Sequence, residues 1–458
     1  MTRRPTPALA LYAFVVGLPL HNLVLAELYD AGVRGATLDV LAAWKEALLA
    51  GALLWCGLLA WRARRPPFRP GLVDALALAY AAAVVLYAVL PQSALGGEAG
   101  AKAIVFGLRH DLALVAAYFL GRCVRPDLRR LGWTVAGAAA AVAAWGLVDA
   151  YAVPLQWWRE SGVPGWFRDE LGHRYQGLSG LPENFVYNPG DEQPVRRLVS
   201  TFLSPLATSY MLVVALLLLA TRGRSRLAWG LALVTAAGLA WTYSRASWIA
   251  LAIGLLVLAG AARRWWPVAA AAVVLAGGVG FAEAFPHIGP PTSFTAAELE
   301  YQRERARSSP DASHDPLSPS ESSVSSHWRN LRDGIETVVR HPQGYGLGNA
   351  GATAQRFGVR LRAGESSYTE LGVETGVAGL ALFLAFALAL LAGLVRAGPA
   401  AAGVAASLAA VLALGVQTDV VGVHWLAYCL WWLAGALLAP AAARADAAIL
   451  SPPPAASV

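Results

Sequence analysis

Long uncharged apolar runs recur along almost the whole 458-residue chain, and they constrain its fold more than any other feature. About 20 apolar residues suffice to cross a bilayer as an α-helix. Hydrophobic residues make up 57% of the chain and charged ones only 14%, so lipid is the solvent this surface requires. The sequence predicts an all-α, polytopic membrane bundle of about 12 transmembrane helices. We expect them at 8–29, 38–61, 71–90, 103–121, 131–153, 200–220, 227–243, 246–262, 267–283, 367–395, 400–418 and 421–440.

Arginines gather in alternate connections between these expected spans. They occur within 62–69, 122–130, 222–226 and 263–264, at 396, and near the two termini at Arg3, Arg4 and Arg444. Positively charged short loops stay in the cytoplasm. We therefore predict a bacterial inner-membrane protein with both termini cytoplasmic and its active face periplasmic. The loop arginines also account for the net charge of +7, which thus indicates no nucleic-acid partner.

The same topology predicts the domain organisation. Nine spans fall within 1–283 and are interrupted by a Trp-rich periplasmic loop at 154–199, which we expect to lie along the membrane interface. A large periplasmic loop follows at 284–366, then three spans within 367–443 and a disordered cytoplasmic tail at 444–458. Inside the large loop, the polar run Ser308–Ser326 is expected to be mobile. An amphipathic helix is expected over His327–Arg340, with its apolar residues on one face: Leu331, Ile335, Val338 and Val339.

Ionisable residues inside spans are costly and are usually functional. The clearest set here is Arg109, His110 and Asp111, near the outer end of the fourth expected span. The set is either a paired charge cluster that holds helices together or a basic contact for an anionic lipid headgroup.

Arg245 lies in a short turn that the topology places outside, where arginine is disfavoured. A guanidinium can hold a phosphate through two parallel hydrogen bonds, so we interpret Arg245 as a phosphate ligand. The alternative is simple snorkelling to the membrane interface.

Three further polar stretches fall on the same side. They are Ser326–Arg329, a glycine-rich turn at His341–Asn349, and Gly364–Tyr368 just before a long span. The turn lacks the Lys-Ser/Thr pair of a phosphate-binding nucleotide loop, so it does not predict a nucleotide site.

Taken together, these motifs resemble the O-antigen ligase and O-antigen polymerase superfamily of envelope glycosyltransferases, over about 196–391. The resemblance is carried by Arg197-Leu198-Val199-Ser200-Thr201-Phe202, by Thr242-Tyr243-Ser244-Arg245-Ala246, and by the His-Pro…Gly-Tyr-Gly-Leu-Gly turn.

The chain departs from the family pattern at two places. Ligases of the family carry a histidine, then Asn, Ser or Gln, then nine residues, then Gly-x-x-Gly. Here the pattern is Glu365-Ser366-x9-Gly376-Val-Ala-Gly. This favours a polymerase-like or divergent member. The family often has an arginine about fifteen residues before the loop proline, which is Pro342 here. That position holds His327, and Arg329 follows two residues later, so either residue could fill the role.

The resemblance implies a GT-C-like fold and transfer of a glycan from a polyprenyl diphosphate to an acceptor hydroxyl on the periplasmic face. It implies inversion by single displacement without a metal or other cofactor, in keeping with the missing Asp-x-Asp motif. The implied partners are this donor, a glycan or lipid acceptor, membrane lipids and a possible chain-length regulator protein. Arg245, Glu365 as the base, and His327 are the expected catalytic residues. The expected substrate contacts are Arg109, His110, Arg197, Arg329 and Tyr368.

Two other functions fit the hydropathy. One is a transporter or flippase of lipid-linked oligosaccharides, which the concentration of polar motifs in an outer loop disfavours. The other is a protein-directed oligosaccharyltransferase on the same scaffold.

Overall fold

The structure is a computed structural model that describes residues 7–173, 181–182, 185–188, 193–222, 225–307 and 315–438. These residues are mostly helical, as expected. Within them, two short strands, β1 (Val186–Tyr187) and β2 (Val195–Arg196), pair antiparallel. The predicted tail at 444–458 and the terminal arginines lie outside the described residues, as do Arg224 and the first part of the polar run, 308–314.

Eight helical segments are long and apolar enough to cross a membrane. The first comprises α1 (Ala8–Gly17), η1 (Leu18–Leu20) and α2 (His21–Asp30). The others are α4 (Trp44–Ala63), α5 (Leu72–Val89), α7 (Ala101–Cys123), α8 (Leu128–Ala152), α13 (Arg245–Ala262), α14 (Trp266–Ile288) and α18 (Ser367–Arg396). Together they confirm a multi-pass, all-α membrane protein.

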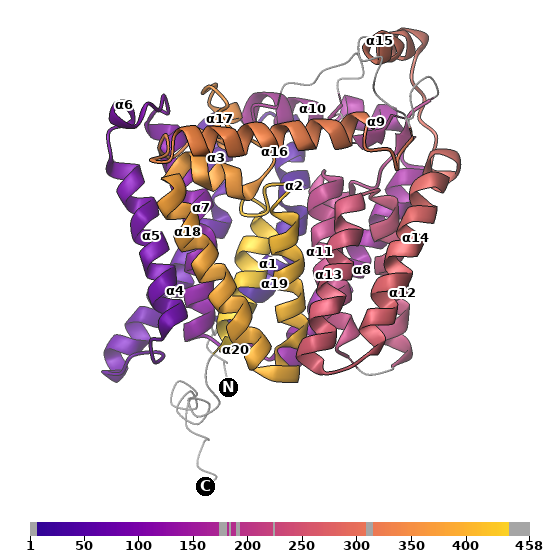
Figure 1. Cartoon of the computed structure of the whole chain (residues 1–458). Helices are drawn as coiled ribbons and strands as arrows, with labels where there is room; N and C mark the ends of the chain where they lie inside the picture. The colour runs from indigo at the N-terminus through magenta and orange to yellow at the C-terminus, as the bar shows by residue number, and fades with distance from the viewer. Residues whose placement is uncertain are drawn as a thin grey trace.

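Four shorter apolar helices run among them (Figure 1): α11 (Pro205–Ala220), α12 (Arg226–Trp241), α19 (Ala402–Leu414) and η6 with α20 (Leu426–Leu430 and Trp431–Leu438). Thirteen helical residues rise only about 20 Å, less than the roughly 30 Å of a hydrocarbon core. The count of about 12 spans therefore stays a prediction. The last two expected spans are shortened because the chain between α19 and η6 is irregular around 415–423. Such backbone is tolerated at membrane depth where protein surrounds it.

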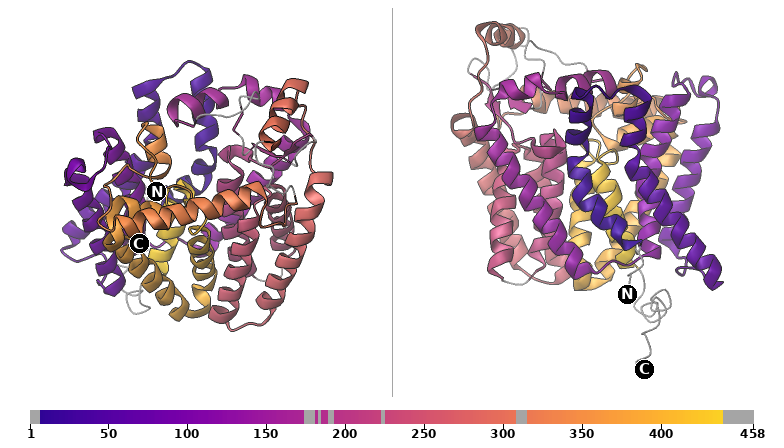
Figure 2. Two further views of the ribbon diagram at one scale, coloured as in Figure 1. Left: turned by 45° about the horizontal axis from the view of Figure 1, so that its top comes forward. Right: turned by 180° about the vertical axis from the view of Figure 1, so that it is seen from behind.

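The two ends of the bundle differ in character. The connections α4–α5, α7–α8 and α13–α14, which carry arginines, and the connection after Arg396 between α18 and α19 lie at the lower end in Figure 1. The upper end carries the helices α3 (Gly35–Ala42), α6 (Gln92–Leu95), α9 (Leu155–Glu160), α10 (Val163–Gly165), α15 (Ala296–Arg307), α16 (Ser322–Arg340) and α17 (Gly351–Arg356). Figure 2 shows α16 lying across this end, roughly perpendicular to the spans, from α18 towards α13 and α14.

The largest hydrophobic core runs through the centre of the bundle and includes almost every side chain of η6 and α20. A helix that is apolar all round must be surrounded by protein or lipid, and here neighbouring helices α7, α18 and α19 surround it. A second cluster lies at the upper end. Trp158 and Trp166 are buried in it against Leu25 and Leu38, so these two tryptophans pack inside the protein, whereas Trp157 is exposed.

The amphipathic helix of the large loop is longer than expected. α16 begins at Ser322, so residues 322–326 are helical and the prediction that they are mobile was wrong. The expected apolar face is also only partly buried. Val338 packs against Gly372 of α18, whereas Ile335 and Val339 are exposed.

The glycine-rich turn packs against a kink in α18. Gly376 has φ 66°, and a Cβ atom there would lie 2.7 Å from the Pro342 carbonyl oxygen. Gly344, with φ 76°, approaches Gly376 so closely that its own Cβ would lie 2.4 Å from the Gly376 nitrogen. The two glycines therefore let the turn and the kinked helix meet backbone to backbone.

Candidate active site

The candidate catalytic residues His327 and Glu365 are in direct contact. The Nδ1 atom of His327, on α16, lies 2.6 Å from Oε2 of Glu365, just before α18. Both side chains remain partly open to solvent, at 32% and 44% exposure. A carboxylate that accepts from Nδ1–H fixes the tautomer of an imidazole and leaves Nε2 free to take a proton.

Glu365 differs from the carboxyl expected from the sequence. The hydrogen bond from His327 lowers the pKa of Glu365 and outweighs burial, whereas a carboxylate serves best as a general base when its pKa is raised. Its backbone also has φ 71°, a conformation that costs a non-glycine residue roughly 1–3 kcal/mol and often marks a functional site. Glu365 is thus an ionised carboxylate held in a strained turn.

Arg245 is the first residue of α13, and it reaches the beginning of α16. Its Nη2 atom lies 2.9 Å from Oε2 of Glu321, and its Nη1 donates to the carbonyl of Pro316. Glu321 is the N-cap residue of α16 and accepts from the Val324 backbone N–H. Glu321 and His327 are six residues apart on this helix, a rise of about 9 Å. The N-terminal part of α16 therefore contacts both Arg245 and Glu365.

A second guanidinium lies near Arg245. Arg197 donates from Nε to the Thr242 carbonyl at 3.0 Å. Burial, followed by the positive charge of Arg245, lowers the pKa of Arg197 to about 10. Two arginines that repel each other at a partly buried position are typical of a site for an anion.

Two other predicted substrate contacts point elsewhere. Arg329 is exposed on α16 and, in the part of the chain the structure describes, makes no ion pair. Two residues along a helix turn by about 200°, so Arg329 and His327 lie on opposite faces of α16. Tyr368 donates its hydroxyl to the Leu412 carbonyl of α19 and so faces the interior of the bundle.

Arg109 and His110 lie deeper, on α7. The Arg109 Nε atom is 3.5 Å from Oε1 of Glu46, and its guanidinium covers the Phe106 ring. His110 lies between two carboxylates, with Nδ1 2.8 Å from Asp111 and Nε2 2.9 Å from Asp419. These carboxylates are unfavourable surroundings for an anionic headgroup at His110.

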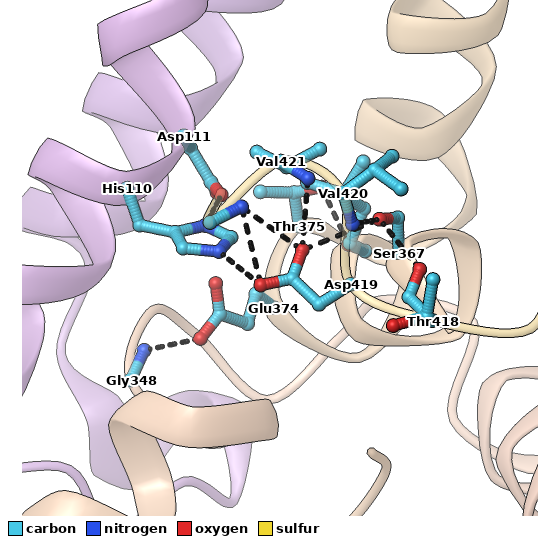
Figure 3. Close-up of polar contacts among 12 residues, drawn as sticks. His110, Asp111, Gly348, Ser367, Glu374, Thr375, Thr418, Asp419, Val420 and Val421 are labelled. Atoms are coloured by element: carbon cyan, nitrogen blue, oxygen red, sulfur yellow. Dashed lines mark hydrogen bonds and ion pairs between the residues drawn. The ribbon is translucent and has the colours of Figure 1, made fainter. Parts of the chain in front are cut away.

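The cluster around His110 is one that sequence reasoning missed. Figure 3 shows Asp419 accepting from the backbone N–H of Val421 and from the hydroxyl of Ser367, and Glu374 accepting from the Gly348 N–H at 2.7 Å. Glu370, one turn before Glu374, also belongs to this cluster. One ligand atom from each of His110, Glu370 and Asp419 falls within 4.8 Å of the others, so these three could hold a metal ion. The signal in the sequence was a pair of glutamates four residues apart at the start of an apolar span.

Comparison with known proteins supports the resemblance drawn from the motifs. Residues 229–384 match the family described as O-antigen ligase. The matched segment includes Arg245, His327, Arg329, Glu365 and Tyr368, and it excludes Arg109, His110 and Arg197. A search of curated proteins finds no match. The match covers about a third of the chain, and over that segment it supports the resemblance to the O-antigen ligase and polymerase superfamily.

Proposed function

We propose that this protein is a membrane glycosyltransferase that moves a glycan from a polyprenyl diphosphate to an acceptor hydroxyl. The observation that carries the proposal is the contact between His327 and Glu365, on a helix whose N-cap residue holds Arg245. This contact places a base on α16, with an orienting carboxylate beside it. The cation Arg245 contacts the same helix about two turns away.

The reaction would take place on the periplasmic side of a bacterial inner membrane. The arginine-rich connections lie at the end of the bundle away from α16 (Figure 1), and such connections stay cytoplasmic. α16 would then lie on the periplasmic face. A lipid-linked donor suits that face because its diphosphate is the leaving group and no nucleotide is required. Membrane lipids surround the remainder of the chain.

Arg245 and Arg197 would hold the diphosphate. Negative charge grows on its oxygens as the glycosidic bond breaks, and fixed guanidinium groups stabilise that charge without having to reorganise. In this proposal the two arginines supply the charge stabilisation, and the step uses no metal or other cofactor.

His327 would act as the general base, with Glu365 as its positioning residue. The acceptor oxygen attacks the anomeric carbon as its proton passes to Nε2 of His327. A new C–O bond forms, the C–O bond to the diphosphate breaks, and the carrier leaves as the diphosphate. The single displacement inverts the anomeric carbon. The base is therefore His327 and not Glu365, which the sequence indicates. A carboxylate with a lowered pKa that accepts from Nδ1–H is better suited to orienting the imidazole than to abstracting a proton.

The acceptor is either another lipid-linked glycan, as for a polymerase with a chain-length regulator as partner, or a lipid, as for a ligase. Both use the same step, since in each case a sugar hydroxyl attacks the donor.

The test is turnover by the purified protein in lipid nanodiscs with a polyprenyl-diphosphate oligosaccharide and an acceptor glycan. We expect free polyprenyl diphosphate and an extended glycan whose new linkage has the inverted configuration by NMR. Retention of configuration would contradict the single displacement. In proteoliposomes, movement of the donor between leaflets with no glycan transfer would instead identify a flippase.

A further inference from the structure

Negative charge exceeds positive charge around His110, in the middle of α7. Figure 3 shows the carboxyl groups of Asp111, Glu374 and Asp419 around one imidazole. Glu370 also brings a carboxyl oxygen within 4.8 Å of ligand atoms of His110 and Asp419. Asp111 and Glu370 are 0% and 6% exposed. Several buried carboxylates cannot all stay negatively charged unless a cation compensates them. Otherwise some of them must be protonated.

The side chains converge as metal ligands do. One atom each from His110, Glu370 and Asp419 lies within 4.8 Å of the other two. Bonds of about 2.0–2.2 Å from nitrogen and oxygen to a divalent ion place neighbouring ligand atoms roughly 3–3.5 Å apart. Small shifts of the side chains would therefore bring all three into the first coordination shell.

The hydrogen bonds of His110 match those of a metal-bound histidine. Its Nδ1 is bonded to Asp111 at 2.8 Å, the partnership that commonly orients a metal-bound histidine. Its Nε2 then faces Asp419 at 2.9 Å, and two acceptors at that distance need a proton or a metal ion between them.

A buried carboxylate oxygen without a hydrogen bond and a second carboxyl group without an ion pair lie at the same place among the described residues. Among the described residues, Oδ2 of Asp111 is buried without a hydrogen bond although Oδ1 of the same carboxylate touches His110. The Glu370 side chain makes no hydrogen bond or ion pair within the described part of the chain, although it is directed at His110 and Asp419. A buried carboxylate that faces two other ligand atoms and has no hydrogen bond is placed as a metal ligand would be.

We propose that His110, Glu370 and Asp419 bind a divalent first-row metal cation, with Asp111 as the carboxylate that orients His110. One imidazole with two carboxylates is a donor set suited to Mn²⁺ or Zn²⁺, whereas Mg²⁺ and Ca²⁺ prefer oxygen ligands alone. His110 and Asp419 expose 19% and 22% of their side chains, so the site is not fully enclosed by protein.

The ion would fasten three segments together: α7, the start of α18, and the irregular chain between α19 and η6. Ser367, the first residue of α18, donates to Asp419 and lies two residues after Glu365. The metal would thus position the turn that carries Glu365 without taking part in glycan transfer, and the site does not depend on the function proposed above.

Metal binding is measured directly on the full-length protein. The protein is purified in detergent, stripped with a chelator, and titrated with Mn²⁺ and with Zn²⁺. We expect one ion per chain by elemental analysis and a higher melting temperature when it is bound. The bound Mn²⁺ should show ¹⁴N coupling in pulsed electron paramagnetic resonance, from His110.

Variants distinguish this site from surface binding. Glu370→Gln should weaken the affinity by at least about 100-fold, and Asp111→Asn by about 10–100-fold. Glu336→Gln, an exposed carboxyl of α16, should leave it unchanged. If Glu370→Gln does not fold, the affinity of Asp111→Asn and the nitrogen coupling in the wild-type protein test the proposal instead. The proposal would be overturned if the protein bound neither Mn²⁺ nor Zn²⁺, or if every variant bound the ion with equal affinity. Bound Mn²⁺ without nitrogen coupling would also overturn it. So would stability that rises with acid but not with metal, because protons would then neutralise the cluster.

Discussion

His327 and Glu365 are joined by a 2.6 Å contact between Nδ1 and Oε2 across 38 residues of chain. The contact ties α16, which lies across the end of the bundle, to the turn just before α18. A loop helix and a span are thereby joined at the point where we propose that the acceptor loses its proton.

The first prediction concerns pH. The hydrogen bond from His327 lowers the pKa of Glu365 from its ordinary value of 4.5, so the contact adds stability above that value and loses it as pH falls through the lowered one. Glu365→Gln, which keeps the shape and the strained φ, should therefore melt at a lower temperature than wild type at pH 7. The difference should shrink as the solution is acidified below about pH 4. A difference that is constant with pH would show that the carboxylate charge is irrelevant.

The second prediction separates two roles of Arg245. If its guanidinium holds the diphosphate, Arg245→Lys should lower turnover by about 10²–10³-fold, because an ammonium lacks the bidentate fork. Glu321→Gln removes the charge that anchors Arg245 to α16 but leaves the guanidinium, so it should cost less than about 10-fold. Arg332→Ala, an exposed arginine of the same helix, is the control for surface charge. Equal losses in Arg245→Lys and Glu321→Gln would make Arg245 an anchor of α16 only.

The third prediction tests the contact between the glycine-rich turn and α18. A side chain at Gly376 would meet the Pro342 carbonyl at 2.7 Å with φ at 66°, so Gly376→Ala should lower the free energy of unfolding by about 2–4 kcal/mol. Gly137→Ala, in α8, adds a methyl group where nothing lies within 4 Å and should not destabilise the protein. Both are measured by thermal unfolding in detergent, and equal stability would contradict the close backbone contact.

The fourth prediction concerns a buried ion pair at the upper end. Arg196 and Asp149 are 3% and 0% exposed and lie 3.0 Å apart, and Trp158 donates to the same carboxylate. Arg196→Met should destabilise the fold by about 3–5 kcal/mol because it leaves a buried charge unpaired. Adding Asp149→Leu should restore much of that stability. A single variant as stable as wild type would show that water or another group already compensates Asp149.

The sequence predicted those features that depend on local composition. Apolar runs located the helices, and motif spacing pointed to Arg245, His327 and Glu365. It could not predict which of these touch, because the pairing of His327 with Glu365 and of Arg245 with Glu321 depends on how α16 lies across the bundle.

The cluster around Asp419 was missed for a related reason. Hydropathy alone extends α19 and α20 towards each other and leaves Asp419 in a short turn between two expected spans. In the structure both helices are shorter, and the irregular chain between them carries Asp419 to His110 of α7. Backbone hydrogen bonds that replace helix, such as those from Val421 and Gly422 to Asp419, leave no mark in a hydropathy pattern.

The rate of glycan transfer in a double-mutant cycle of His327 and Glu365 tests the central claim most directly. We predict that His327→Gln lowers the rate by about 10²–10⁴-fold and Glu365→Gln by less, and that the double variant is no slower than His327→Gln, because a base and its orienting carboxylate act as one unit. Wild-type rates in both single variants would contradict the account, and so would losses that multiply in the double variant.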